Sequence, residues 1–180
     1  QTLVLDSLDW LEPLIWRTTC DRQSPRWNDI ETPGYGKGYA AALDVWREFL
    51  DGINGLRDDR GMAVVLIAHA DIKRFDSPET EPYDRYEIKL HQRAAGLVQE
   101  WADCVLFANY RVMTTKDDVG FNQKVTRAIG SGDRLLHTSE RPAYLAKNRY
   151  SLPESLPLAW QAFSDAMTTA VPASHPATAA

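Results

Sequence analysis

The chain has 180 residues, of which 44% are hydrophobic and 25% are charged, and its formal net charge is −5. It contains no apolar run near the roughly 20 residues that cross a bilayer and no signal-peptide pattern, which excludes a membrane-spanning protein and favours a cytoplasmic one. Cys20 and Cys104 are far apart in apolar contexts, as expected for free thiols in a reducing compartment. The scattered histidines do not have the spacing of a zinc site.

The first ten residues predict a strand that ends at a polar edge. Thr2 to Leu5 run without a charge into Asp6 and Ser7, a pattern that indicates a strand buried on both faces. Ligands of α/β sheets bind outside the carboxyl ends of the strands, so Asp6 is well placed to hold a cation beside a phosphate, as in a Walker B strand. An Asp or Ser that only caps the next helix gives the same pattern, and that alternative stays open. Because the chain opens inside a core strand, we expect it to be the C-terminal part of a longer protein.

A helix, a loop, a second helix and a second strand follow. Apolar residues at helical spacing predict a short helix that ends near Cys20. Asp9 in its first turn is more typical of a helix-start charge than of a catalytic residue, and the catalytic role stays open as the alternative. Residues 21–38 predict a long polar loop, and Tyr39 to Arg57 predict an amphipathic helix that Gly61 ends. Residues 62–68 form a second continuous apolar run, which ends at His69. The helical crossover between the two strands favours parallel neighbours.

The second half of the chain changes from helical to shorter strand patterns. A second loop, a helix and a third buried strand are predicted over residues 70–89, 90–102 and 103–110. Antiparallel hairpins then follow, with turns at 117–118, 130–132 and 140–142 and strands at 134–138 and 143–149. One last amphipathic helix is predicted over 158–167, and the Ala/Pro-rich tail from Ala170 is expected to be disordered.

Two groups of residues carry patterns that suit phosphate chemistry. A lone His at a strand end is more often a structural group, but His69 ends a strand expected beside that of Asp6, where it can contact a phosphate or an attacking water. Lys147 and Arg149 lie two residues apart on a predicted strand, so both can reach one anion. Exposed charges that protect an edge strand give the same spacing, and that alternative also stays open.

The two long loops combine aromatic and basic side chains, which is what single-stranded nucleic acid requires. The candidate nucleic-acid-binding residues are Lys37, Lys73, Arg74, Phe75, Arg85 and Tyr86. Acidic residues in 70–89 offset this charge, so an ordinary solvated loop remains an alternative. The excess of basic residues lies later: residues 111–149 carry eight Lys or Arg against four acids, whereas residues 1–110 carry twelve against nineteen.

The order of these elements resembles the C-terminal two thirds of a RecA-type P-loop ATPase core over residues 2 to about 160. The stretches that carry the resemblance are TLVLDS, GYGKGYAAALDVWREFLDGI, MAVVLIAH, IKRFDSPETEPYDRYEIKLH, VQEWADCVLFANY and LAKNRYSLPESLPL. They are most similar to phage-encoded nucleotide-binding proteins of the single-strand-annealing recombinase kind. The resemblance implies an α/β fold, a three-layer RecA-like core with a mostly parallel sheet that antiparallel strands extend at the C-terminal side. Residues 1–169 would be the C-terminal part of one such domain, and residues 170–180 a disordered tail.

The resemblance also implies roles for single residues. Asp6 matches the Walker B aspartate that holds Mg²⁺ through water, with Ser7 supporting it, and His69 falls at the family's polar sensor position. Lys147 and Arg149 match a basic pair that such assemblies insert into a neighbour's nucleotide site. The motif GxxxxGK[ST] and the catalytic glutamate are missing from these 180 residues, so we expect both upstream and expect this chain alone to be inactive.

These expectations combine into one function and two alternatives. The complete protein is expected to bind ATP and Mg²⁺ between the subunits of a homo-oligomeric ring or filament, to hydrolyse ATP and to act on single-stranded DNA in phage recombination or replication, within the bacterial host cytoplasm. The alternatives are a P-loop-less interaction module that does not hydrolyse ATP, and a DNA-binding subunit without a nucleotide role.

Overall fold

The computed structural model describes residues 1–118 and 124–170, and describes the backbone alone for 112–118 and 124–131. The chain separates into two units, residues 1–101 and the part that begins at Ala102, and each is described by itself. Residues 171–180 of the predicted tail lie outside the described residues. The elements of the first unit are β1 (Thr2–Asp6), α1 (Leu8–Asp21), α2 (Lys37–Arg60), β2 (Ala63–Ile67), β3 (Ala70–Phe75), β4 (Tyr83–Ile88) and α3 (Gln92–Trp101).

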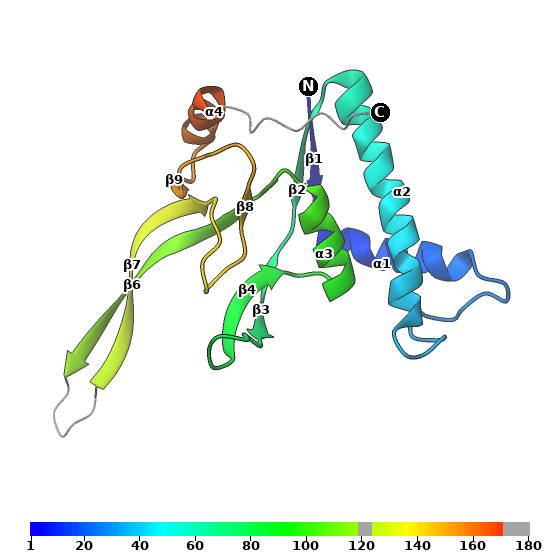
Figure 1. Ribbon diagram of the computed structural model, residues 1–180, viewed down its shortest axis with the longest axis horizontal. Helices are drawn as coiled ribbons and strands as arrows, with labels where there is room; N and C mark the ends of the chain where they lie inside the picture. The colour runs from blue at the N-terminus through cyan, green and yellow to red at the C-terminus, as the bar shows by residue number, and fades with distance from the viewer. Residues whose placement is uncertain (119–123, 171–180) are drawn as a thin grey trace. The chain divides into compact units, whose positions relative to one another are not determined.

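Strands β1 and β2 pair in parallel, as predicted, with Asp6 opposite Ile67 (Figure 1). The prediction that both faces are buried is wrong for the described residues. Leu5 and Leu66 pack against the core, whereas Val4 is 55% exposed and Val65 41% exposed. A continuous apolar run does not say how many faces are covered, and the core of this unit lies against only one face of the pair.

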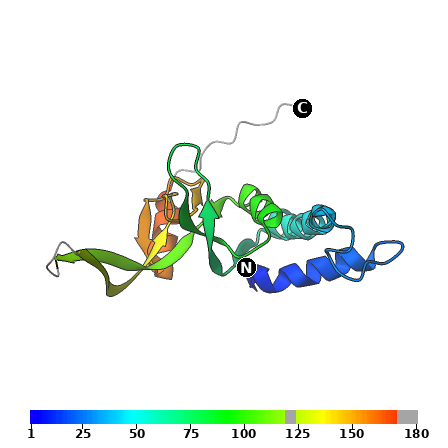
Figure 2. The same ribbon diagram turned by 90° about the horizontal axis from the view of Figure 1, so that it is seen from below.

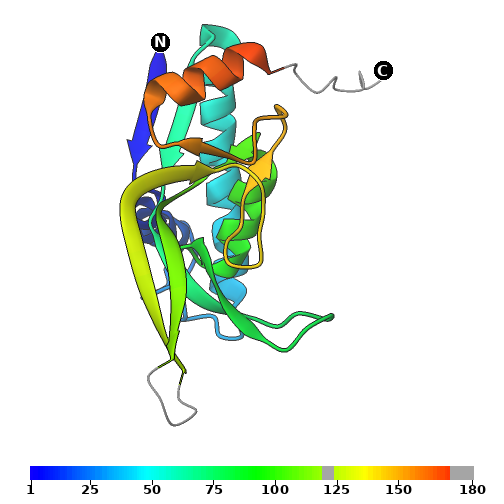
Figure 3. The same ribbon diagram turned by 90° about the vertical axis from the view of Figure 1, so that its left-hand side faces the viewer.

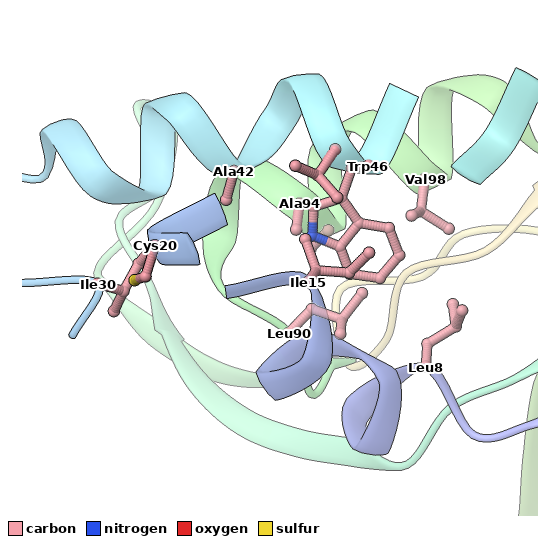
Figure 4. Close-up of a cluster of buried hydrophobic side chains, with 11 residues drawn as sticks. Leu8, Ile15, Cys20, Ile30, Ala42, Trp46, Leu90, Ala94 and Val98 are labelled. Atoms are coloured by element: carbon pink, nitrogen blue, oxygen red, sulfur yellow. The ribbon is translucent and has the colours of Figure 1, made fainter. Parts of the chain in front are cut away.

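The core of the first unit forms where three helices meet. Trp46 of α2 is fully buried at its centre, and α1 crosses α2 rather than running along it (Figures 1 and 2). The other buried residues of the cluster, most of them labelled in Figure 4, are Leu8, Ile15, Cys20, Ile30, Ala42, Val45, Leu90, Ala94, Ala95 and Val98. Most of them repeat at helical spacing within α1, α2 and α3, so the amphipathic pattern of each helix accounts for its burial.

Helix α2 is longer than predicted by two residues at its start and three at its end. It ends at Gly61, whose φ of 59° is a left-handed conformation that glycine adopts without steric cost, as predicted. In α1, Pro13 lies inside the helix, beyond the first turn that was expected to hold it. Its side chain is exposed, so the ring faces away from the core.

Of the two predicted long loops, only the first is a loop in the structure. Residues 22–36 between α1 and α2 form turns without a helix or strand, as expected. Residues 70–89 are instead an antiparallel hairpin of β3 and β4 with Ala70 opposite Ile88, so the prediction of a loop is wrong. Each face of the hairpin mixes apolar or aromatic residues with charged ones, as Ile72 and Arg74 do on one side of β3, so the sequence shows no clear period of two.

The second unit is built from antiparallel strands. Its elements are β5 (Cys104–Val105), β6 (Phe107–Asp118), β7 (Lys124–His137), β8 (Lys147–Asn148), β9 (Ser155–Pro157) and α4 (Trp160–Thr169). Strands β6, β7 and β9 form one sheet, and β5 pairs with β8. Figure 3 shows β6 and β7 as one long hairpin that curves along its length. The predicted antiparallel character of this part is therefore confirmed for the described residues.

Several details of the second unit correct the sequence predictions. The third strand, expected as one buried element, is split into β5 and β6, and Tyr110 is 60% exposed. Residues 130–132 lie inside β7 instead of forming a turn, because β7 pairs with β6 on both sides of a register shift between Tyr110 and Val112. The strand expected over 143–149 is reduced to the two residues of β8. The predicted turn near Pro142 is present, closed by paired hydrogen bonds between Arg141 and Tyr144.

Candidate functional site

The carboxyl ends of β1 and β2 place the first predicted site residues at one edge. Asp6 ends β1 beside Ile67, and His69 follows β2 by two residues. Asp6 is exposed, and no described residue pairs with its carboxylate. The peptide bond between Asp6 and Ser7 is cis. The parallel register thus brings Asp6 and His69 to the same edge of the sheet, as expected from the sequence.

Asp9 and Ser7 form a buried polar pair just beyond this edge. The Ser7 hydroxyl is buried and donates to Asp9 Oδ1 at 2.6 Å. The side chain of Asp9 is only 9% exposed, although it lies in the first turn of α1. Ser7, predicted to support Asp6, is therefore bonded to Asp9.

His69 binds the same carboxylate of Asp9. Its Nδ1 lies 3.0 and 3.1 Å from the two carboxylate oxygens, and its backbone N–H donates to Oδ1 at 3.3 Å. Burial acts to raise the pKa of the Asp9 carboxyl, but the hydrogen bonds from Ser7 and His69 outweigh it and hold the pKa well below its usual range. Asp9 is thus an ionised carboxylate that fixes the position of His69. From the sequence, a helix-start charge was favoured for Asp9 over a catalytic role.

A cleft of about 620 Å³ opens beside this pair. Helix α1 contributes aromatic and acidic side chains to its wall, and β3 and the segment after β4 contribute lysines. The lining residues are Asp9, Trp10, Glu12, Pro13, Trp16, His69, Asp71, Lys73, Lys89 and Leu90. The indole of Trp10 is 75% exposed. The cleft therefore presents an aromatic surface next to charges of both signs.

Glu12 is a buried carboxylate that the sequence analysis missed. It is 6% exposed, and both of its oxygens accept the backbone N–H of His91, at 3.0 and 3.1 Å, just before α3 begins. Burial raises the pKa of the Glu12 carboxyl, although this hydrogen bond and the charge of Lys73 act in the opposite direction. Lys73 itself donates to the Leu90 carbonyl at 2.8 Å. The sequence could have predicted this burial, because Glu12 occupies the apolar face of α1 between Leu8 and Ile15.

The hairpin divides the predicted nucleic-acid-binding residues between its two faces. Phe75 and Arg85 share one face with Lys73, and Arg85 lies over the Phe75 ring at 3.9 Å while it also pairs with Glu87 at 2.8 Å. On the other face, Arg74 and Tyr86 are exposed, and Arg74 lies 3.9 Å from Asp84. Lys37, the one member of this predicted set that lies outside the hairpin, is exposed at the start of α2. Only part of the set is therefore presented to solvent.

Lys147 and Arg149 belong to the second unit. The Lys147 ammonium donates to the Ala102 carbonyl at 2.7 Å, and the Arg149 guanidinium pairs with Asp103 at 3.1 Å. The Arg149 backbone N–H also donates to the Asp103 carbonyl. Both basic side chains thus contact the segment that leads into β5.

The described residues contain no group of three or more His, Cys, Asp or Glu side chains arranged to hold a metal ion. Mg²⁺ in phosphate-binding proteins keeps several waters and uses one or two carboxylates together with the phosphates. A single exposed carboxylate, as Asp6 provides, fits that water-mediated role. In the described part of the chain, no helix is both long and apolar enough to span a membrane.

Comparison with known protein families identifies a match. A family model described as an AAA domain matches residues 1–150, which is most of the chain and includes Asp6, His69, Lys147 and Arg149. No curated protein and no solved structure matches the chain.

Proposed function

The chain belongs to the AAA domain family, and on this premise we propose that it is the C-terminal portion of a RecA-like phage protein that binds and hydrolyses ATP and acts on single-stranded DNA in recombination or replication. The observation that carries the proposal is the parallel register of β1 and β2, which brings Asp6 and His69 to one carboxyl edge. Such an edge is where α/β sheets bind phosphate-containing ligands.

Each predicted site residue has a role in this proposal. Asp6 holds a water of the Mg²⁺ shell, and the metal supplies charge neutralisation at the terminal phosphates of ATP. Lys147 and Arg149 reach the nucleotide of a neighbouring subunit in a ring or filament and stabilise the charge that develops during hydrolysis. The contact of Arg149 with Asp103 is exposed enough to exchange, since the Arg149 side chain is 42% exposed.

The DNA-binding part of the proposal is supported chiefly by one face of the hairpin. Arg74 and Tyr86 lie on neighbouring strands of that face, with Ile72, 60% exposed, directly opposite Tyr86. An exposed aromatic ring stacks on a base, and an adjacent guanidinium pairs with a phosphate. Lys73, Phe75 and Arg85 have partners within the hairpin and are proposed to support this face.

The proposal is tested with the protein expressed from its complete reading frame. We expect it to hydrolyse ATP faster in the presence of single-stranded DNA, and Asp6→Ala to reduce kcat at least about 100-fold because a metal-binding carboxylate is lost. Asp44→Asn removes the same charge from an exposed position of α2 and should leave kcat unchanged. Phosphate release is the measurement.

Two outcomes would contradict the proposal. Undiminished hydrolysis by Asp6→Ala would remove the Walker B assignment. The codons upstream of Gln1 give an independent result: a strand followed by GxxxxGK[ST], roughly 60–100 residues earlier, supports the ATPase. A start codon directly before Thr2 would instead favour the interaction module that does not hydrolyse ATP.

A further inference from the structure

The cleft beside α1 has one wall that is built from aromatic and apolar rings. Trp10 and Trp16 both belong to α1 and both line the cleft, and Pro13 continues the wall between them. Trp10 is 75% exposed. An indole ring gains much from being covered, and small-molecule sites are typically concave surfaces that such rings line. This wall is therefore a surface on which a planar ligand can lie.

Packing within the first unit holds the inner part of the wall in place. The Trp16 ring meets the Tyr39 ring edge-on, with 5.4 Å between the ring centroids, and Tyr39 stacks on His91 at 3.9 Å. The backbone N–H of His91 donates to the buried carboxylate of Glu12, which itself lines the cleft. A site that is organised in this way before binding loses less conformational entropy when a ligand enters.

The charged side chains of the lining largely offset one another. The lining contains three carboxylates, two lysines and one histidine. Asp9 is bonded to His69, and the charge of Lys73 acts against the rise in the pKa of Glu12 that burial causes. One exposed carboxylate and the ammonium of Lys89 remain. A free phosphate or carboxylate would meet like charges inside the cleft, so a neutral planar ring suits it better.

Lys89 adds an exposed cation to the lining. Its backbone N–H donates to the His69 carbonyl at 2.9 Å, which fixes its position at the base of the hairpin. The ammonium of Lys73 instead donates to the carbonyls of Ile88 and Leu90. Of the two lysines in the lining, Lys89 is thus the one placed to pair with a phosphate attached to a ring in the cleft.

We propose that this cleft binds an unpaired base of single-stranded DNA, which stacks on Trp10 while Lys89 pairs with the adjoining phosphate. An indole stacks on any of the four bases, so the site takes single strands without regard to sequence. The inference rests on the DNA-binding part of the proposed function and does not require ATP hydrolysis. It adds a second contact to the hairpin face of Arg74 and Tyr86. Lys73, which lines the cleft, precedes Arg74 on β3, and consecutive residues of a strand point to opposite faces.

The first test measures the affinity of the protein, expressed from its complete reading frame, for a fluorescein-labelled oligothymidylate by fluorescence anisotropy. Trp10→Ala should weaken binding roughly 5- to 150-fold, as the loss of a stacking ring commonly does. Trp10→Phe keeps a ring and should stay within about threefold of the wild type. Trp160→Ala removes a similarly exposed tryptophan from α4 and should leave the affinity unchanged. Circular dichroism verifies that each variant is folded.

The second test addresses the phosphate contact through its salt dependence. Each phosphate contact to a single strand contributes about 0.7 to the slope of log affinity against log salt concentration. Lys89→Gln should lower the affinity at low salt and reduce the magnitude of this slope by about 0.7. Arg47→Gln removes an exposed cation from α2 and should leave the slope unchanged. An unchanged slope for Lys89→Gln would overturn the assignment of Lys89.

A competition experiment distinguishes a DNA strand from a free nucleotide as the source of the base. Unlabelled oligothymidylate should displace the labelled strand, whereas thymidine monophosphate at the same nucleotide concentration should not, because one stacked base contributes only part of the binding of a strand. Equal displacement by the two would reassign the cleft to a free nucleotide.

The remaining outcomes separate this inference from the function on which it rests. If Arg74→Ala weakens DNA binding and Trp10→Ala does not, the protein binds DNA by the hairpin face, the inference is wrong, and the exposed ring is then a surface for a partner protein. If the wild-type protein binds no single-stranded DNA, the DNA-binding part of the proposed function and the inference both fall. If it binds DNA but hydrolyses no ATP, only the ATPase part falls, and the variants of Trp10 and Lys89 still decide the role of the cleft.

Discussion

At the scale of single residues, Asp9 and Glu12 lie one turn apart on α1 and respond to pH with opposite signs. The pKa of Asp9 is lowered, so its contribution to stability is present above the ordinary pKa of about 3.9 and is lost as pH falls through the lowered value. The pKa of Glu12 is raised by burial, so the folded protein keeps that proton to higher pH than the unfolded chain does. Stability from Glu12 therefore falls as pH rises above about 4.3.

The raised pKa of Glu12 predicts how the stability of the Glu12→Gln variant depends on pH. The amide oxygen still accepts the His91 N–H, and the cost of burying a charge is removed. The free energy of unfolding, measured with urea, should be at least that of the wild type at pH 7, and the advantage of the variant should shrink as pH falls to 4. All other titrating groups are common to both chains, so the difference isolates Glu12. A deficit that stays constant from pH 4 to 7 would mean that the second carboxylate hydrogen bond outweighs burial.

At the scale of elements, the start of α2 is fixed by the loop that precedes it. A Cβ on Gly38 would lie 1.8 Å from the carbonyl oxygen of Ile30, whose side chain belongs to the core. Gly52, in the interior of the same helix, has nothing within 4 Å of the corresponding position. The two glycines therefore differ in packing although both are helical.

The prediction is that Gly38→Ala and Gly52→Ala change stability in opposite directions. Gly38→Ala must displace the loop backbone and should cost about 1–3 kcal/mol, as overpacked sites do. Gly52→Ala removes the conformational freedom of glycine from a helix and should stabilise by about 0.5–1 kcal/mol. Thermal unfolding followed by circular dichroism is the measurement. Equal effects of the two substitutions would contradict the close approach of the loop at Ile30.

Some elements of the fold could be predicted from the sequence alone, and others could not. Helix α2 and the parallel pair β1–β2 were predictable, because long helical periodicity and two apolar runs joined by a helix leave few alternatives. The hairpin over 70–89 was not, since each of its faces mixes charged residues with apolar or aromatic ones and leaves no clear period of two. The site was predictable as far as Asp6 and His69 at one edge. The Asp9–His69 contact joins residues 60 positions apart in the chain, and only the packing of α1 against the end of β2 brings them together.

At the scale of the whole molecule, the proposed catalytic groups are divided between the two units. Asp6 and His69 lie in the first, and Lys147 and Arg149 in the second. The resemblance to RecA-type assemblies implies that the second pair serves a neighbouring subunit, and a division of labour of this kind can be tested by mixing subunits. When two inactive variants are mixed, activity returns only at interfaces where one subunit supplies the residue that the other lacks.

We therefore predict recovery of ATP hydrolysis when Asp6→Ala and Arg149→Ala subunits of the complete protein are mixed. With random assembly from equal amounts, about one quarter of the interfaces combine an intact Asp6 with an intact Arg149 from the neighbour. Hydrolysis should rise with the fraction of such interfaces and be maximal near equal mixing. The measurement is phosphate release after the subunits have been exchanged at fixed total concentration.

The control for this experiment mixes Arg149→Ala with the double variant Asp6→Ala/Arg149→Ala. No interface in that mixture contains an intact Arg149, so activity should stay at the level of Arg149→Ala diluted by an inactive chain. Recovery in the first mixture and none in the control would assign Arg149 to the neighbour's site. In the first mixture, every subunit that keeps Asp6 lacks its own Arg149. An arginine that acted within its own subunit could therefore not restore activity. If neither mixture recovers at any ratio, Arg149 does not act between subunits, and its pairing with Asp103 is then its role in the fold.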